Sequence, residues 1–260
     1  MDRHLDIRDR KNLSGEEIKS LNFINGSGPY CFRKYYRSGL RSHIFEVLLV
    51  EDMHKETNGI IENGVRIFPR ACPEKVFRIF RKRFATSEQI VQEIHKYNIL
   101  LDVLGPDLIA LSEEFMVEYT NAGGNTILLC GLQEYIKGEI LDPWKIFGKT
   151  YIQDLHSLMP CHAATRENFV QTATKNIERF VTKIRQMIIE NGYIPDLAGI
   201  GNLILTPDGT LKLVDINNIV QINYDKTVPI DDKGYPSCDV SVQVLHILEQ
   251  KLLNTDLSAD

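Results

Sequence analysis

Apolar and polar residues alternate through most of the first half of the chain, and a period of two is typical of β-strands. Strands are predicted on this basis at 32–36, 43–50, 65–68, 76–80, 108–119 and 126–130. A helical spacing interrupts them at Ile90, Ile94 and Tyr97, directly after the capping-box pattern of residues 86–89. We therefore expect an antiparallel sheet accompanied by one long helix.

The period changes to that of a helix in the second half of the chain. Apolar spacings of three or four residues predict helices at 144–158, 168–191 and 239–253, and Gly192 is placed as the C-cap of the second. Two short apolar runs, 203–205 and 211–214, flank the turn residues 206–209. Because Pro207 presets φ and Gly209 accepts a positive φ, these runs are predicted to pair as a hairpin.

This order of elements predicts an α+β fold in two lobes. The first lobe, residues 1–137, would hold the antiparallel sheet and the long helix. The second lobe, residues 138–260, would be mainly helical and would carry the hairpin region 196–215. Residues 133–138 are the expected hinge between them, and the chain after Asp239 has room for one late helix.

The composition argues against several kinds of binding partner and site. The net charge of −5 argues against a nucleic acid, which would require a clustered basic surface. The basic run 78–83 alternates with apolar residues, so it is expected to be a strand with a solvated charged face. The five scattered cysteines form no Cys-x-x-Cys pair and indicate neither a disulfide framework nor a zinc site. No signal peptide or membrane span is visible, so a cytoplasmic protein is expected.

Polar residues flank the predicted hairpin. Asp196 precedes it, Asn202 stands at its entrance, and Asp215 follows its second strand. A rigid hairpin can bring these oxygen-bearing side chains together, and Mg²⁺ prefers hard oxygen ligands. A structural explanation is also open for each residue, because an acid beside a turn can cap it and an asparagine at a strand entrance can satisfy backbone groups.

With these features the chain from residue 76 onward resembles the protein-kinase-like superfamily, in the broad sense that includes aminoglycoside phosphotransferases and bacterial sugar kinases. The strand 76–80 is similar to the family strand Val-Ala-Ile-Lys. The resemblance implies that Arg78 is the phosphate-binding cation. Its partner on the following helix would be Glu93, with Glu88 as the second candidate. A solvated strand charge is the other interpretation of Arg78.

Residues 133–141 are similar to the family's hinge. The backbone of Glu134, Tyr135 and Ile136 would there hydrogen-bond the adenine ring. The resemblance thus implies ATP as the bound nucleotide, although the backbone makes the contacts and the side chains carry little of the signal.

The stretch 192–215 is similar to the family's catalytic loop and metal-binding segment. By this resemblance Asp196 is the catalytic acid that orients or deprotonates the acceptor hydroxyl. Asn202 and Asp215 would hold Mg²⁺, and Asp239 would be a structural acid that ties the catalytic loop in place.

The resemblance implies an ATP- and Mg²⁺-dependent phosphotransferase. Because one helix follows Asp239, where protein kinases have several that dock polypeptides, the expected acceptor is a hydroxyl of a small molecule, sugar or lipid head group.

Two alternatives are open. A catalytically inactive kinase-like module could bind a nucleotide or a protein partner. Arg78 stands where the family has lysine, and Ile194 and Pro195 replace the first two residues of the family's His-Arg-Asp triplet. An unrelated α+β protein would instead place Asp215 far from Asn202 and Asp196.

Overall fold

The computed structural model describes residues 6–26, 28–35, 39, 41–121, 124–148, 150–159, 164–222, 234 and 236–253. The chain has an α+β fold and divides into two compact units. The first, called the sheet unit, comprises Met1–Gln92 and Leu111–Tyr135, and the second, called the helical unit, comprises Glu93–Ala110 and Ile136–Asp260. The chain passes from the sheet unit into the helical unit for the second time after Tyr135, close to the expected boundary between residues 137 and 138. Residues 93–110 belong with the helical unit.

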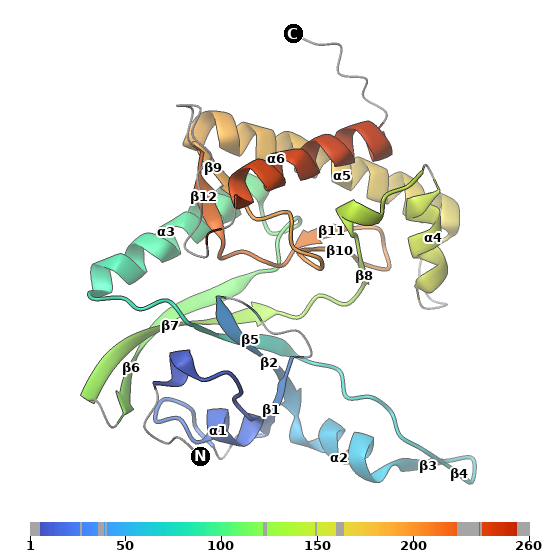
Figure 1. Cartoon of the computed structure of the whole chain (residues 1–260). Coiled ribbons are helices and arrows are strands. Elements are labelled where there is room, and N and C mark those ends of the chain that lie inside the picture. Colours follow the sequence, from blue (N-terminus) through green and yellow to red (C-terminus); the bar gives the residue numbers. More distant parts are fainter. Residues whose placement is uncertain are drawn as a thin grey trace. The chain divides into compact units, whose positions relative to one another are not determined.

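The sheet unit is built on a five-stranded sheet of order β1-β2-β5-β7-β6, with every neighbouring pair antiparallel (Figure 1). Its strands are β1 (Tyr30–Lys34), β2 (Ser42–Leu49), β5 (Lys75–Phe80), β6 (Ser112–Asn121) and β7 (Gly124–Glu134). The alternating sequence pattern predicted each of them, and the observed bounds differ from the predicted ones mainly at the ends.

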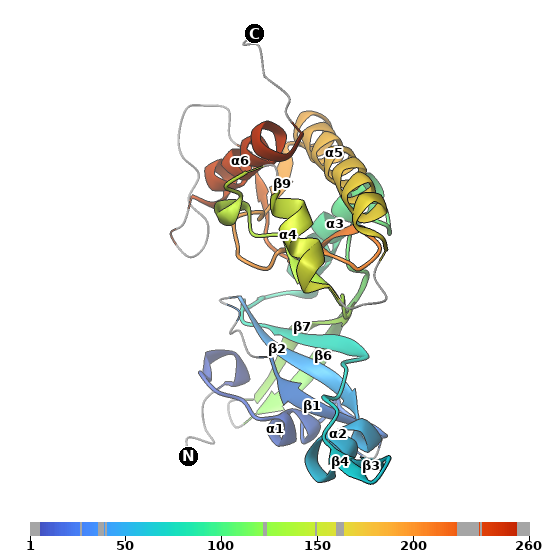
Figure 2. The same ribbon diagram turned by 90° about the vertical axis from the view of Figure 1, so that its right-hand side faces the viewer.

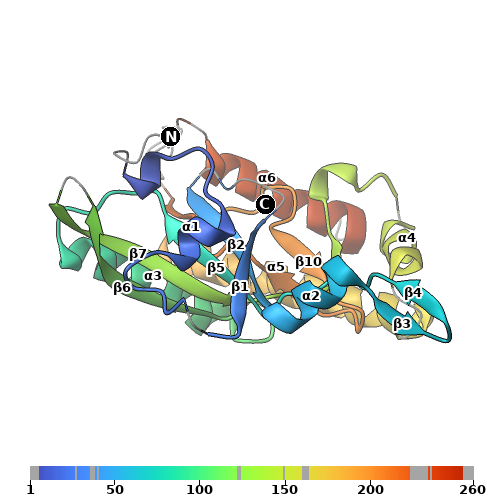
Figure 3. The same ribbon diagram turned by 90° about the horizontal axis from the view of Figure 1, so that it is seen from below.

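One face of this sheet is apolar and is covered by the N-terminal segment. Phe45, Phe77 and Ile79 pack there against Ile18 and other apolar residues of the first twenty-one positions. That segment contains the 3₁₀-helix η1 (Ile7–Asp9) and α1 (Gly15–Lys19), which lie across the sheet (Figure 3). A capping box begins α1, since Ser14 and Glu17 cap each other's backbone N–H groups.

Residues 50–58 form a helix, α2 (Val50–Asn58), that the apolar pattern does not predict. No side chain of α2 is buried, so no apolar periodicity marks it in the sequence. Lys55 pairs with both Glu51 and Asp52 along the helix surface. Glu56 of α2 also pairs with Arg33 of β1 at 2.8 Å, so charged contacts support this helix. It leads into the hairpin of β3 (Ile60–Glu62) and β4 (Val65–Ile67) (Figure 2).

The helical unit contains most of α3 (Ser87–Leu104), together with α4 (Tyr151–Leu158), α5 (Arg166–Asn191) and α6 (Ser237–Leu248), which continues into the π-helical turn η3 (Glu249–Leu253). The apolar face predicted for α5 is buried, and Gly192 ends the helix with a φ of +68°, as expected for a C-cap. The predicted helix 144–158 is wrong in its first half. A 3₁₀ turn, η2 (Pro143–Lys145), stands there, and α4 begins at Tyr151.

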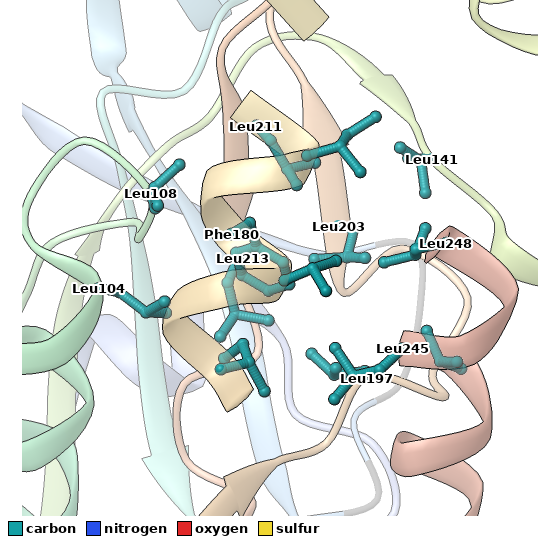
Figure 4. Packing of buried hydrophobic residues seen from close by; sticks show 14 of the residues in the cluster. Leu104, Leu108, Leu141, Phe180, Leu197, Leu203, Leu211, Leu213, Leu245 and Leu248 are labelled. Atoms are coloured by element: carbon teal, nitrogen blue, oxygen red, sulfur yellow. The ribbon is translucent and has the colours of Figure 1, made fainter. Parts of the chain in front are cut away.

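Two small sheets complete the helical unit. One has the order β11-β10-β8, with β8 (Glu139–Ile140), β10 (Leu203–Leu205) and β11 (Leu211–Leu213), and the other pairs β9 (Tyr193–Pro195) with β12 (Ile219–Gln221). The leucines of β10 and β11 are at most 1% exposed and join α5 and α6 in one core (Figure 4). Gly138 is required beside β8, because a Cβ there would lie 2.1 Å from the carbonyl oxygen of Leu205.

No helix in the described part of the chain combines the length and the apolar character that crossing a bilayer demands.

His43 makes the stability of the sheet unit depend on pH. Burial, and then the charge of Arg81, lower the pKa of His43 from 6.5 to about 4, and its Nε2 faces the carbonyl oxygen of Ile7 at 2.9 Å. Below pH 6.5 this histidine is protonated in the unfolded chain, whereas in the folded chain it stays neutral until the pH approaches 4. The free energy of unfolding therefore falls as the pH drops from 6.5 to 4. At pH 4.5 the loss in the free energy of unfolding is about 2 to 3 kcal/mol, because one unit of pKa difference corresponds to roughly 1.4 kcal/mol.

Urea unfolding of the wild type and of His43→Gln, at pH 7 and pH 4.5, measures this effect. The wild type should lose about 2 to 3 kcal/mol more than the variant between the two pH values. Equal losses would show that His43 does not resist protonation in the folded state.

Candidate functional site

The predicted hairpin is present and places Asn202 next to the segment that ends in Asp215. Leu203 pairs with Leu213 and Leu205 with Leu211, in antiparallel register. Gly209 has a φ of +85° in the connecting turn, as predicted. Beyond the last pair, the Val214 N–H donates to the carbonyl oxygen of Asn202 at 2.8 Å. Asp215 therefore directly follows the cross-strand neighbour of Asn202.

The side chain of Asn202 reaches back to Asp196. Its Nδ2 donates to the backbone carbonyl oxygen of Asp196 at 2.9 Å, and its N–H donates to the carbonyl oxygen of Gly199 at 3.0 Å. A Cβ on Gly199 would lie 2.6 Å from Asn202 Oδ1, so glycine is needed where the loop folds over this amide. Together with the hairpin pairing, these bonds bring the predicted residues Asp196, Asn202 and Asp215 into one loop cluster.

The carboxylate of Asp196 is held at both oxygens. Oδ1 accepts the N–H of Ala198 at 2.9 Å, and Oδ2 accepts Nδ2 of Asn218 at 2.8 Å. The backbone is fixed too, because the Asp196 N–H donates to the carbonyl oxygen of Asn218 at 2.8 Å. These contacts extend the β9–β12 pairing by one residue pair. The sequence analysis did not single out Asn218, since strands this short give no periodic signal.

Asp215 begins a tight polar turn. Its Oδ1 accepts the N–H of Asn217 at 3.5 Å, and Asp215 is half-buried. Asn217 carries a buried Oδ1 with no hydrogen-bond partner among the described residues. A buried oxygen without a donor is costly unless a proton or a cation satisfies it. The turn thus holds a carboxylate and an amide oxygen, and it directly follows the residue that pairs with the backbone of Asn202.

The late helix does tie the loop in place, through a different residue from the predicted one. Asp239 is exposed in the first turn of α6. Ser241, fully buried on the same helix, accepts the N–H of Leu197 on its Oγ at 3.0 Å. A serine two positions further along the helix therefore makes the anchoring contact expected of the aspartate.

Arg78, in the sheet unit, is buried and ion-paired. Its side chain is 5% exposed, and its Nη2 lies 2.5 Å from Oε1 of Glu114, whose side chain is 2% exposed. The same Nη2 donates to Oγ of Ser112 at 3.0 Å. The interpretation of Arg78 as a solvated strand charge is therefore wrong.

Register explains how Arg78 reaches Glu114 across an intervening strand. Both residues stand opposite Gly131 of β7, one from β5 and the other from β6. A Cβ on Gly131 would lie 2.8 Å from Glu114 Oε1 and 2.9 Å from Arg78 Nη2. The missing side chain leaves the space in which the ion pair forms. Glu114 was not predicted, because nothing local in the sequence links it to Arg78.

The remaining predicted residues lie on α3, at the end of β7 and directly after β7. Glu93, on α3, has Lys96 as an ion-pair partner at 3.3 Å. Glu134 ends β7, and its N–H donates to the carbonyl oxygen of Leu111 at 2.8 Å. Tyr135 and Ile136 follow as half-buried residues outside any strand. The chain thus leaves the sheet at the residues where the hinge is predicted.

Among the described residues, no group of three His, Cys, Asp or Glu side chains is placed to hold a metal ion. The predicted Mg²⁺ site does not need such a group, because Mg²⁺ is usually bound by one or two protein ligands together with substrate phosphates and water.

Comparison with protein-family models and with curated proteins finds no match for this chain.

Proposed function

We propose that the chain is a kinase-like, bilobal phosphotransferase that uses Mg²⁺ and ATP to phosphorylate a hydroxyl of a small molecule, sugar or lipid head group. The observation that carries the proposal is the loop cluster of the helical unit. There, Asn202 bonds to Asp196 at 2.9 Å and pairs with the residue before Asp215. These are the residues that the family resemblance assigns to catalysis and metal binding.

The donor set of this cluster suits a magnesium-bound nucleotide. Asp215 supplies a carboxylate. Asn202 donates through its Nδ2 to Asp196, so its Oδ1 is the atom of this amide that can act as a ligand. The buried Oδ1 of Asn217 is a further hard oxygen in the same turn. Oxygen ligands of this kind, few in number, are what Mg²⁺ accepts when phosphates complete its coordination. When bound, Mg·ATP supplies the transferable phosphoryl group and the cation that offsets its charge.

Asp196 is the proposed base. Its carboxylate accepts hydrogen bonds from Ala198 and Asn218, and neither donor is charged, so it can still accept a proton from an acceptor hydroxyl. In the proposed step the hydroxyl oxygen forms a bond to the γ-phosphorus while the bond from that phosphorus to the β,γ-bridging oxygen breaks. The proton passes to Asp196, and ADP leaves.

The sheet unit supports the proposal less directly than the helical unit does. Arg78 was expected to contact phosphates and to pair with Glu93. Its charge is compensated by Glu114, and its side chain is 5% exposed. We therefore base the proposal on the helical unit. The assignment of the backbone of Glu134, Tyr135 and Ile136 to the adenine ring rests on the family resemblance, at the point where the chain leaves β7.

The second candidate function is a catalytically inactive module that binds a nucleotide or a protein. The buried, compensated state of Arg78 favours it, since a cation committed to a neighbouring carboxylate has less of its field available for a phosphate.

Thermal unfolding with ATP, in the presence of Mg²⁺ and in the presence of EDTA, separates these functions. The proposal predicts stabilisation by ATP that requires Mg²⁺, of about 2.7 kcal/mol at a ligand concentration a hundredfold above Kd. The same stabilisation in EDTA would favour the inactive nucleotide-binding module. No stabilisation in either condition would remove the nucleotide from the account.

A further inference from the structure

Asn218 faces the proposed catalytic carboxylate rather than a backbone group. Its residue is 5% exposed, and its Nδ2 lies 2.8 Å from Asp196 Oδ2. The orientation of this amide follows from chemistry, because an ionised carboxylate only accepts hydrogen bonds and so must face the NH₂ group. A buried amide that donates to a carboxylate makes a charge-assisted bond, stronger than one between neutral groups.

The strand pairing does not require this contact. Asn218 and Asp196 stand opposite each other at the end of β9–β12, and their backbones are already joined by the 2.8 Å bond from the Asp196 N–H. The side-chain bond adds a second connection whose effect is to fix the carboxylate. With Ala198 holding Oδ1 and Asn218 holding Oδ2, rotation of the carboxylate is blocked at both ends.

From this geometry we infer that Asn218 is a positioning residue that aims the Asp196 carboxylate at the acceptor hydroxyl. The inference rests on the proposed function. A carboxylate has about four lone-pair sites, and one bond to each oxygen leaves further sites free to accept a proton. The amide of Asn218 therefore orients the carboxylate without occupying all of its acceptor sites.

The test is steady-state kinetics of ADP release from Mg·ATP, with water and a panel of hexoses and polyols as acceptors. The variants are Asn218→Ala, which removes the donor, and Asn218→Leu, which keeps a similar volume but cannot donate. Both should lower kcat about 10- to 100-fold, since small errors in the placement of a reacting group have effects of this size. KM for ATP should change less than about twofold, because Asn218 contacts Asp196 and not the metal ligands.

Asn176→Ala is the matched control. Its amide, in the same unit, donates to the carbonyl oxygens of Thr172 at 3.0 Å and Gly209 at 3.2 Å. This variant loses comparable hydrogen bonds but keeps the contacts of Asp196, so its kcat should equal that of the wild type. A merely structural effect would appear equally in the melting temperatures of both alanine variants and would leave kcat of the folded protein unchanged.

The outcomes are distinguishable. If the wild type releases ADP and both Asn218 variants keep its kcat, the positioning inference is overturned and the proposed function stands. If the wild type releases no ADP with any acceptor, the proposed function fails and the inference fails with it. Should Asn218→Ala not fold, Asn218→Leu, which fills the same space, decides.

Discussion

Replacing Glu114 by alanine should destabilise the sheet unit by about 3 to 5 kcal/mol, the range found when one partner of a buried ion pair is removed. The variant would leave the Arg78 guanidinium, on a side chain 5% exposed, with Ser112 as its remaining described hydrogen-bond acceptor. An uncompensated buried charge cannot recover its hydration without opening the structure. Urea unfolding followed by far-UV circular dichroism measures the loss.

Two further variants make this result interpretable. Glu113→Ala removes an exposed carboxylate from the neighbouring position of β6 and should change stability by less than about 0.5 kcal/mol. Arg78→Leu combined with Glu114→Leu removes both charges and should recover most of the stability lost in Glu114→Ala, because apolar pairs often replace buried ion pairs without loss. A double variant as unstable as Glu114→Ala would show that the packing, and not the unpaired charge, causes the effect.

Asp196→Asn should lower the turnover of Mg·ATP by about 10²- to 10⁴-fold, which is the usual contribution of a general base. The amide keeps the shape of the carboxylate but cannot take the proton of the acceptor. The affinity for ATP should stay within about twofold, since the proposal places the metal on Asn202 and Asp215. Single-turnover kinetics and an ATP titration of the same preparation measure the two quantities.

Asp208→Asn is the control for this substitution. Asp208 is exposed in the hairpin turn, where it accepts hydrogen bonds from Thr206 and Thr210. The same change of charge at this position should leave turnover unaltered. Equal turnover in Asp196→Asn and the wild type would remove Asp196 from the chemistry.

The sequence predicted those parts of the fold that carry a periodic apolar signal. The five strands of the main sheet and the buried face of α5 follow directly from apolar spacing. Helix α2 was missed because it buries no side chain, and its stabilising pairs along Lys55 are a pattern of charge rather than of hydrophobicity. A helix of this kind can be predicted only from oppositely charged residues spaced three or four positions apart.

The candidate site was predictable only where its residues are close in the sequence. Asp196, Asn202 and Asp215 lie within one loop and hairpin, so turn chemistry sufficed to bring them together. Glu114 pairs with Arg78 through the register of three strands and the absence of a side chain at Gly131. No local pattern encodes such a contact. The family resemblance pointed instead to Glu93, on the next helix along the sequence.

Asn218 and Ser241 were missed for a related reason. Asn218 meets Asp196 through strands of three residues each, too short to show a period. Ser241 reaches the loop from α6, and the conspicuous residue of that helix start was the charged Asp239. Small polar residues that anchor a loop by a single bond have no distinctive signature in a lone sequence.

The most direct test of the account is electron paramagnetic resonance of Mn²⁺, used in place of Mg²⁺, with a non-hydrolysable ATP analogue. Binding of the metal through Asn202 and Asp215 predicts that the wild type lowers the signal of free Mn²⁺ beyond the level that the analogue produces alone. Asp215→Ala should lose this additional binding, because the carboxylate is the charged protein ligand. Equal Mn²⁺ binding by the wild type and Asp215→Ala would contradict the metal assignment and, with it, the proposed phosphotransferase site.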